Sequence, residues 1–269
     1  MRTTAMAEPT YTLREQVAIG CRVVGLNLGS TGHVSARIPG TDEMYLRCRG
    51  GGAEGGLPYT DLHHIRQVDF DGEGPKLGTR HFSPGETPVH GEVYRARPEV
   101  GAVVHAHPYY TLLCGMTGLE FRPIFGGYDP QATGIAVLGV PVYPRAATVT
   151  DKQMALEMLE AMRDRDVCLL RAHGVVTTGR TVQQAVGVAL QLEHLAKITW
   201  ELAAAGMKVP DISGPDFERY DARNPDRPRA PANRGGQAVP PEERGFMVAH
   251  IHRLQESIGL PSWELDEEG

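Results

Sequence analysis

Four side chains, one glutamate and three histidines, stand where they could bind a metal ion together: Glu86, His105, His107 and His173. His105 and His107 are separated by one residue and follow a short apolar run. Since alternate side chains of an extended strand point the same way, both imidazoles would face one site. Three neutral nitrogens and a carboxylate suit a divalent transition metal such as Zn²⁺, Mn²⁺ or Fe²⁺.

Spacing alone leaves a simpler interpretation open. The chain has 11 histidines, and a His-x-His pair is often only part of a surface strand. His173 favours the metal site, because it follows a second buried-strand pattern and directly precedes Gly174. A catalytic metal typically takes three protein ligands and keeps one position open. The residues by themselves therefore predict either a metal centre or ordinary strand histidines.

The composition is that of a soluble globular chain. Of its 269 residues, 41% are hydrophobic and 22% are charged, which fits one large domain or a domain with an extended tail. The net charge is −6 and no basic block stands out, so nucleic acids and anionic membrane surfaces are poor partners. No apolar run approaches the roughly 20 residues that span a bilayer, and residues 1–9 lack the apolar core of a signal peptide.

The four cysteines are scattered, and no Cys-x-x-Cys pair is present: Cys21, Cys48, Cys114 and Cys168. They mostly lie in apolar stretches, which predicts buried free thiols in a reducing cytoplasm. A cysteine nucleophile is disfavoured for the same reason.

Strand patterns alternate with helical patterns along residues 12–205. The apolar periodicity predicts helices at 12–27, 88–96, 108–116, 150–163 and 181–205. Short strands are predicted at 34–38, 44–48, 67–70, 102–105, 135–138, 142–143, 167–171 and 175–178. Thr150 is the predicted cap of one helix, and Thr181 with Gln184 forms a capping-box pattern before the longest one. Residues 49–60 are glycine-dense and predict a loop. Together these elements indicate a three-layer α/β or α+β sandwich.

The C-terminal part differs in composition. Residues 208–243 are rich in proline and charge, which disfavours regular structure and predicts an extended arm. A final helix is predicted at 245–257, docked on its own or a neighbouring subunit, and a disordered linker is the alternative. We therefore divide the chain into a catalytic domain at 1–207 and an arm with a C-terminal helix at 208–269.

Four ordered pieces of the chain resemble the class II aldolase/adducin family over roughly residues 12–206. They are Thr-Gly-His-Val-Ser-Ala-Arg at 31–37, the Glu86 segment, Ala-Val-Val-His-Ala-His at 102–107 and Leu-Arg-Ala-His-Gly at 170–174. The resemblance implies a mainly antiparallel central sheet flanked by helices, and a homotetramer with active sites between subunits. It also implies one divalent metal per subunit on His105, His107 and His173, with Glu86 as a mobile fourth ligand or acid/base.

The departures from the family pattern narrow the activity. Sugar-phosphate aldolases of this family carry Asn where this chain has His33, and a serine pair where it has Pro84 and Gly85. Those residues bind a substrate phosphate, which needs several hydrogen-bond donors. A sugar-phosphate aldolase or epimerase is therefore disfavoured. Adducin-like proteins lack the metal ligands that this chain keeps, so a purely structural role is disfavoured too.

The Gly-His-Val-Ser-x-Arg form resembles a branch of decarboxylases that act on hydroxylated aromatic dicarboxylic acids such as 3,4-dihydroxyphthalate. Leu-Arg-Cys-Arg-Gly at 46–50 and Leu-Pro-Tyr-Thr at 57–60 resemble the same branch. The function expected is a metal-dependent carbon–carbon lyase. One alternative is an iron oxygenase of a prenylated hydroxyphenylpyruvate or hydroxymandelate in aminocoumarin-type biosynthesis. Another is a retro-aldol enzyme on a non-phosphorylated substrate.

Decarboxylation needs a proton donor and groups that hold carboxylates. Glu86 and His33 are the main candidates for proton transfer, and the family resemblance adds Tyr128 as a weaker one. Substrate-binding candidates are Arg37, Arg47, Arg49 and Ser35, the arginines because they bind carboxylates in bidentate pairs.

Each candidate also has a structural alternative. His33 could bond backbone at a turn, Arg37 could form an ion pair, and Tyr128 could pack at a subunit contact. Arg47 and Arg49 could share one solvated strand face. Three further histidines are interpreted from position: His90 lies one helical turn after Glu86, close to the metal, whereas His63 and His64 lie on the surface.

Overall fold

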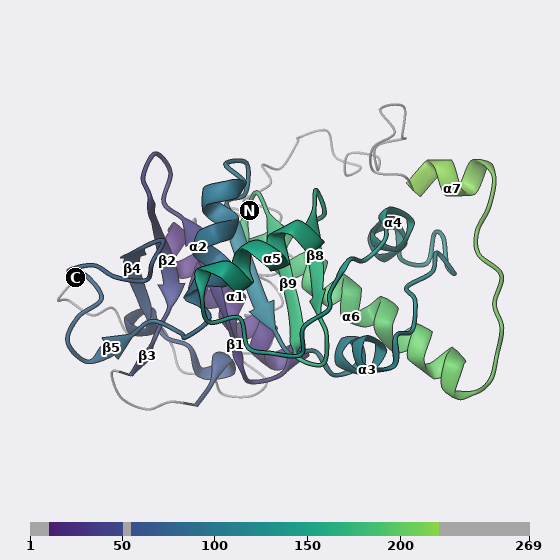
Figure 1. Cartoon of the computed structure of the whole chain (residues 1–269), viewed down its shortest axis with the longest axis horizontal. Coiled ribbons are helices and arrows are strands. Elements are labelled where there is room, and N and C mark those ends of the chain that lie inside the picture. The colour runs from purple at the N-terminus through teal and green to yellow at the C-terminus, as the bar shows by residue number, and fades with distance from the viewer. Residues whose placement is uncertain (1–10, 51–54, 221–269) are drawn as a thin grey trace, which may run out of the picture.

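The computed structural model describes residues 11–50 and 55–220, and its centre is a seven-stranded sheet (Figure 1). The strand order is β4-β2-β1-β6-β9-β8-β7, and only the β7–β8 pair is parallel. The strands are β1 (Gly32–Arg37), β2 (Glu43–Arg47), β4 (Ile65–Asp69), β6 (Ala102–Ala106), β7 (Val142–Tyr143), β8 (Val167–Leu170) and β9 (Gly174–Gly179). A separate two-stranded sheet pairs β3 (Arg49–Gly50) with β5 (His81–Phe82).

Helices cover both faces of the sheet and complete three layers (Figure 1). α1 (Leu13–Leu28) and α6 (Val182–Ala204) share a buried apolar core with one face. α2 (Thr87–Ala96) and α5 (Lys152–Met162) share a second core with the opposite face. The predicted three-layer sandwich with a mainly antiparallel sheet is confirmed.

Alternate residues of one strand supply the two faces. In β1, Val34 and Ala36 belong to the core under α1 and α6. His33 and Ser35 are also buried but point to the α2 side, because successive strand residues face opposite ways. The polar side chains of the motif are therefore set apart from the apolar ones by strand geometry alone.

Two helices have side-chain N-caps at or next to the predicted positions. Asp151, one residue after the predicted Thr150, caps α5 by accepting from the Met154 N–H at 2.8 Å. Thr181 caps α6 by accepting from the Gln184 N–H, but the Gln184 side chain accepts from the Arg180 N–H. The predicted capping box is thus formed in one half only.

The predicted strand at 135–138 is wrong. These residues form the end of α4 (Pro130–Leu138), whose first turn is capped by Asp129, with its carboxylate 3.0 Å from the Ala132 N–H. The apolar run alone did not distinguish a buried strand from a buried helix. Asp followed by Pro is a helix-start signal, and it decides the local conformation here.

Two smaller predictions also need correction. The stretch predicted as a loop at 49–60 contains β3 and a short 3-10 helix, η1 (Leu57–Tyr59), while residues 51–54 lie outside the described residues. His64, expected on the surface, is buried in the 3-10 helix η2 (Leu62–His64), where its Nδ1 accepts from the Asp61 N–H at 3.0 Å. The neighbouring His63 is partly exposed.

The start of the predicted arm packs against other residues of the same chain. Asp211 pairs with Arg122 at 2.6 Å, and the Ile212 N–H donates to Pro123 O at 2.8 Å. A short helix, α7 (Pro215–Tyr220), then packs beside α4 (Figure 1). An entirely extended arm is therefore incorrect for residues 208–220, and the helix predicted at 245–257 lies outside the described residues.

The remaining helix, α3 (Tyr109–Thr117), packs on α6. In residues 11–50 and 55–220, none of the helices has the length and apolarity that crossing a membrane requires. The four cysteines are free and buried, as predicted. Burial raises the pKa of Cys21 and Cys168 to about 12, which makes these thiols poor nucleophiles.

Candidate metal centre and adjoining polar chain

The fold brings the four predicted metal ligands together. One ligand atom from each of Glu86, His105, His107 and His173 lies within 4.8 Å of all the others. His105 lies in β6 and His107 directly follows that strand, His173 occupies the turn between β8 and β9, and Glu86 is the residue before α2. Residues almost 90 positions apart in the chain thus meet because β6 and β9 are neighbours.

Hydrogen bonds orient two of the imidazoles. His105 Nδ1 lies 3.1 Å from Val175 O, and since a carbonyl only accepts, Nδ1 carries the proton and Nε2 presents a lone pair. His107 Nδ1 lies 2.9 Å from Thr31 Oγ1, so the same tautomer is available to His107. The two Nε2 atoms are only 3.0 Å apart. Two lone pairs at that distance repel, and a bound cation would remove the conflict.

Glu86 completes the set with a negative charge. Its carboxylate oxygens lie 3.2 Å from His105 Nε2 and 3.4 Å from His173 Nε2. Burial by itself would raise the pKa of this carboxyl, but the surrounding imidazoles outweigh burial and hold the pKa well below its usual range. Burial together with His105 and His173 lowers the pKa of His107 to about 4. Neutral imidazoles and an ionised carboxylate are the donor set that a divalent metal requires, so the residues fit such an ion.

The turn that carries His173 is sterically constrained. Ala172 has a φ of 53°, in the left-handed region that costs a non-glycine residue about 1–2 kcal/mol. A Cβ on the next glycine, Gly174, would lie 2.4 Å from Ala106 O and 2.8 Å from His107 Cδ2. Glycine after His173 therefore lets the two strands, and the two imidazoles that they carry, approach each other closely.

One side of the cluster is open. His105 and Glu86 are buried, whereas His107 and His173 are partly exposed. A small molecule can therefore approach past His107 and His173, with Glu86 and His105 at the inner wall.

His33 lies against this inner wall. Its Nε2 faces Glu86 Oε2 at 3.8 Å, and its ring centroid is 5.0 Å from that of His105. His33 Nδ1 bonds the side chain of His90, so the alternative of a backbone contact at a turn is not what the structure has. Burial lowers the pKa of His33 to about 4, which keeps this imidazole neutral near pH 7.

His90 and Ser35 lie behind His33 and make no direct contact with the ligands. His90 Nε2 is 2.7 Å from His33 Nδ1, and His90 Nδ1 is 2.6 Å from Ser35 Oγ. Ser35 Oγ also bonds Tyr94 Oη at 2.7 Å. Ser35 is fully buried with both partners on the protein, so its predicted contact with substrate is replaced by a contact with His90.

The structure places the three candidate arginines differently. Arg37 donates to the backbone carbonyls of Tyr94, Arg97 and Val100 at the end of α2. Its guanidinium also lies 4.9 Å from the Tyr94 ring centroid, so Arg37 has a structural role here in place of the predicted substrate contact. Arg47 is buried at the end of β2, and its Nε has no hydrogen-bond partner among the described residues.

Arg49 is exposed and lies in β3, which belongs to the separate two-stranded sheet. The predicted single strand face for Arg47 and Arg49 is therefore wrong. β3 pairs with β5, the strand that leads into the Glu86 segment.

Tyr128 lies at the surface before α4. It is 73% exposed, and its ring contacts Phe125 and His194 at centroid distances of 5.8 and 5.4 Å. No contact joins Tyr128 to the four ligands within the part of the chain that the structure describes. Tyr128 could therefore donate a proton only at the site of a neighbouring chain.

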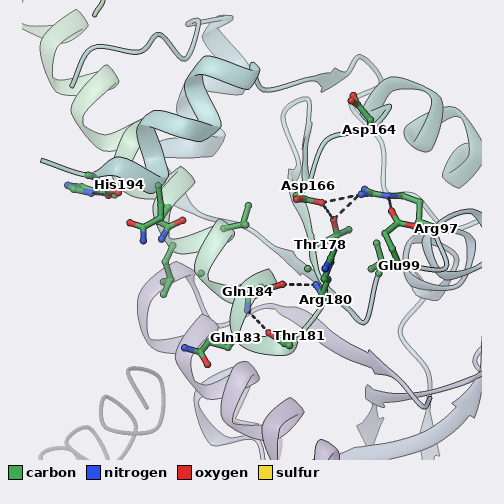
Figure 2. Close-up of a pocket in the computed structure, with 18 residues that line it drawn as sticks. Arg97, Glu99, Asp164, Asp166, Thr178, Arg180, Thr181, Gln183, Gln184 and His194 are labelled. Atoms are coloured by element: carbon green, nitrogen blue, oxygen red, sulfur yellow. Dashed lines mark hydrogen bonds and ion pairs between the residues drawn. The ribbon is translucent and has the colours of Figure 1, made fainter. Parts of the chain in front are cut away.

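A broad polar hollow lies elsewhere, along α6, and none of the four ligands lines it. Figure 2 shows an ion-pair network in it, in which Arg97 lies 2.9 Å from Glu99 and 3.1 Å from Asp166. The hollow is thus separate from the histidine cluster.

Sequence spacing held a signal for Tyr94, which is not among the predicted site residues. Glu86, His90 and Tyr94 recur every four residues along α2, which puts them on one helix face. His33 and Ser35 alternate on β1 and so share a strand face. Only the packing of α2 on β1 decides that these two faces meet.

Comparisons with known proteins agree with this geometry. The class II aldolase and adducin N-terminal domain matches residues 22–200. A 3,4-dihydroxyphthalate decarboxylase of Arthrobacter keyseri is 43% identical over 211 residues, which cover 76% of this chain and 84% of the relative. One from Terrabacter sp. is 40% identical over 209 residues, covering 76% and 87%.

A solved structure shares the fold. The aldolase II superfamily protein from Pseudomonas syringae superposes with a TM-score of 0.69 at 19% identity, covering 94% of this chain and 96% of that one. The chain belongs to the class II aldolase and adducin family, in the branch that includes its decarboxylases.

Proposed function

We propose that this protein is a metal-dependent lyase that decarboxylates a hydroxylated aromatic dicarboxylic acid of the 3,4-dihydroxyphthalate type. The similarity to the Arthrobacter and Terrabacter decarboxylases supports the reaction class. The observation that carries the proposal is the gathering of four ligand atoms within 4.8 Å beside the neutral imidazole of His33. The family resemblance implies asparagine at this position in the sugar-phosphate aldolases.

The metal would be held by His105, His107 and His173 through nitrogen and by Glu86 through oxygen. Zn²⁺, Mn²⁺ and Fe²⁺ all accept this donor set. When bound, a divalent metal supplies Lewis-acid stabilisation of the negative charge that develops as CO₂ leaves. Glu86, ionised and set against three imidazoles, is the one anionic ligand.

Glu86 is the proposed acid/base. Its carboxylate accepts the proton of a ring hydroxyl, which leaves the substrate as a phenolate. The bond between the ring carbon and the carboxylate then breaks, its electron pair stays on the ring carbon, and CO₂ departs. Glu86 returns the proton to that carbon, and the product phenolate takes a proton from water on release.

His33 is the proposed neutral donor in this reaction. With Nε2 facing Glu86, it can donate one hydrogen bond to an anionic oxygen of the substrate or to Glu86 itself. Neutral imidazole is preferred at this position, because the loss of hydration on burial outweighs the opposing effect of the nearby Glu86 carboxylate. In this proposal His33 stabilises negative charge with a hydrogen bond, and Glu86 transfers the proton.

Arg49 is the proposed partner of the carboxylate that stays on the ring. Its side chain is exposed and lies on the strand that pairs with β5, just before the Glu86 segment. Arg47, whose buried Nε has no hydrogen-bond partner among the described residues, is a second proposed partner.

The assembly proposed is a homotetramer with sites between subunits. An aromatic side chain as exposed as Tyr128 supports this, because in an assembly it could reach a neighbouring chain's site. We also propose the division into a catalytic domain at 1–207 and an arm with a C-terminal helix at 208–269, which the change in composition supports. Sedimentation measures the oligomer, and Tyr128→Phe measures the contribution of the hydroxyl group to turnover.

The test of the function is anaerobic turnover of 3,4-dihydroxyphthalate with Mn²⁺, Fe²⁺ or Zn²⁺, followed by CO₂ release and product identification. We expect one CO₂ per substrate without oxygen. Turnover only after oxygen is admitted would make the protein an oxygenase. Formation of an aldehyde or ketone without CO₂ would make it a retro-aldol enzyme.

A further inference from the structure

Four polar side chains form one continuous buried row that ends at the candidate metal centre. The row runs Tyr94, Ser35, His90, His33, with contacts of 2.7, 2.6 and 2.7 Å. None of the four is more than 3% exposed. Beyond His33 stands Glu86, whose Oε2 faces His33 Nε2 at 3.8 Å. Because these hydrogen bonds are buried and short, they hold their partners in a defined arrangement.

The carboxylate at one end favours one direction for the protons in the row. Glu86 Oε2 lies 3.8 Å from His33 Nε2, beyond a direct hydrogen bond, but its negative charge favours an N–H over a lone pair on that nitrogen. His33 Nδ1 is then an acceptor, which requires the proton of His90 to be on Nε2 as well. His90 Nδ1 must accept in turn, so Ser35 donates to it and the Tyr94 hydroxyl donates to Ser35. All four side chains donate toward Glu86.

We propose that Ser35, His90 and Tyr94 are positioning residues that hold His33 as the neutral Nε2–H tautomer, aimed at Glu86 and at any anionic group bound beside it. Within this row His33 Nδ1 accepts from His90 Nε2 across 2.7 Å, so the hydrogen that His33 can donate is the one on Nε2.

The tautomer is argued from the contacts of the row and the charge of Glu86, whereas its effect on turnover rests on the proposed function. A competing explanation is that the row only fastens α2 to β1. The first experiment separates these points without using activity. Neutron diffraction from crystals of the full chain exchanged into D₂O locates the deuterons directly. We expect deuterium on Nε2 of both His33 and His90, and deuterium on His33 Nδ1 would overturn the proposal.

Kinetics of two size-conserving variants test whether the row acts through His33. Ser35→Ala and Tyr94→Phe each remove one donor, and we expect kcat to fall about tenfold, the worth of one hydrogen bond, with KM changed less than about twofold. Tyr143→Phe is the matched control. Tyr143 is also a buried tyrosine on the α5 side of the sheet, but its hydroxyl bonds Glu157 outside the row.

Double variants give the decisive comparison. In a His33→Asn background, Ser35→Ala should cause no further loss of kcat, because its effect passes through the missing imidazole. Equal losses in both backgrounds, or a loss no larger than that of Tyr143→Phe, would reduce the row to a structural fastening. Deuterons as expected in a wild-type protein that releases no CO₂ would refute the proposed function and leave the tautomer assignment intact.

Discussion

The two faces of the central sheet are formed by the same strands, but β1 contributes different kinds of side chain to each face. Under α1 and α6, β1 contributes Val34 and Ala36 to a core of apolar side chains. Under α2, the same strand contributes His33 and Ser35 to a hydrogen-bonded row that ends at the metal ligands. At β1, one face therefore supplies only apolar side chains, and the other supplies polar groups beside the apolar core that α2 and α5 share.

This difference shows how a single strand can serve both purposes. An apolar face tolerates exchange of similar side chains, because burial has no preferred direction. A buried polar row depends on each partner, since one lost donor leaves the next group unsatisfied. Substitutions of the apolar residues should change stability, and substitutions in the polar row should change chemistry.

Loss of a ligand should give the largest effect. We expect His107→Ala to lose bound metal and to lower kcat by about a thousandfold or more, because both Lewis-acid stabilisation and the preorganised site disappear. Elemental analysis and turnover measure the two losses. His63→Ala, a partly exposed histidine outside the cluster, is the control. Full activity of a metal-free His107→Ala protein would refute the metal centre.

On the apolar face, Leu192→Ala should act through stability alone. Leu192 is fully buried in α6, so truncation should cost about 2–5 kcal/mol of unfolding free energy through lost burial and a cavity. Urea unfolding measures the cost. The kcat per folded molecule should equal that of the wild type. A drop in kcat among correctly folded molecules would break the contrast between the two faces.

Acidification should destabilise the polar face of the metal-free protein. The folded-state pKa of His33 is about 4, below its ordinary 6.5, so the unfolded state binds the proton first as pH falls. The stability is complete above pH 6.5 and is lost toward pH 4, by roughly 3 kcal/mol for this one imidazole. Urea unfolding at several pH values should show a shallower loss in His33→Asn. An identical pH dependence in both proteins would contradict the burial argument.

His33→Asn should separate chemistry from metal binding. We expect the metal to stay and kcat to fall by about a hundredfold, the effect of removing one preorganised donor. Metal content and steady-state kinetics are the readouts. Unchanged kinetics in this variant would remove His33 from the mechanism and leave Glu86 alone at the inner wall.

The smallest effect is expected at the rim of the site. Arg49→Gln should raise KM by about tenfold with little change in kcat, because a charge-assisted hydrogen bond to the carboxylate that stays on the ring is lost. Arg95→Gln is a control, since Arg95 lies on α2 and pairs with Asp71 and Glu92, away from the substrate. An unaltered KM would assign that carboxylate to another residue, with Arg47 next to be tested.

Much of the fold followed from local patterns in the chain. The short buried apolar run of β6 and the capped periodicity of α6 each predicted the correct element. The segment at 135–138 was not, because four apolar residues fit a strand as well as a helix. His64 was missed since burial depends on how η2 packs, and periodicity does not report packing.

The sequence by itself determined the donor set and which side chains share a face. His105 and His107, or His33 and Ser35, point the same way because strand residues alternate, whatever surrounds them. Only the tertiary structure decided that β1 pairs with β6, with His33 opposite His105, and that α2 brings His90 onto His33. The same packing drew Arg37 to the end of α2 and left Tyr128 at the surface. Contacts between distant segments depend on register and docking, which local spacing does not encode.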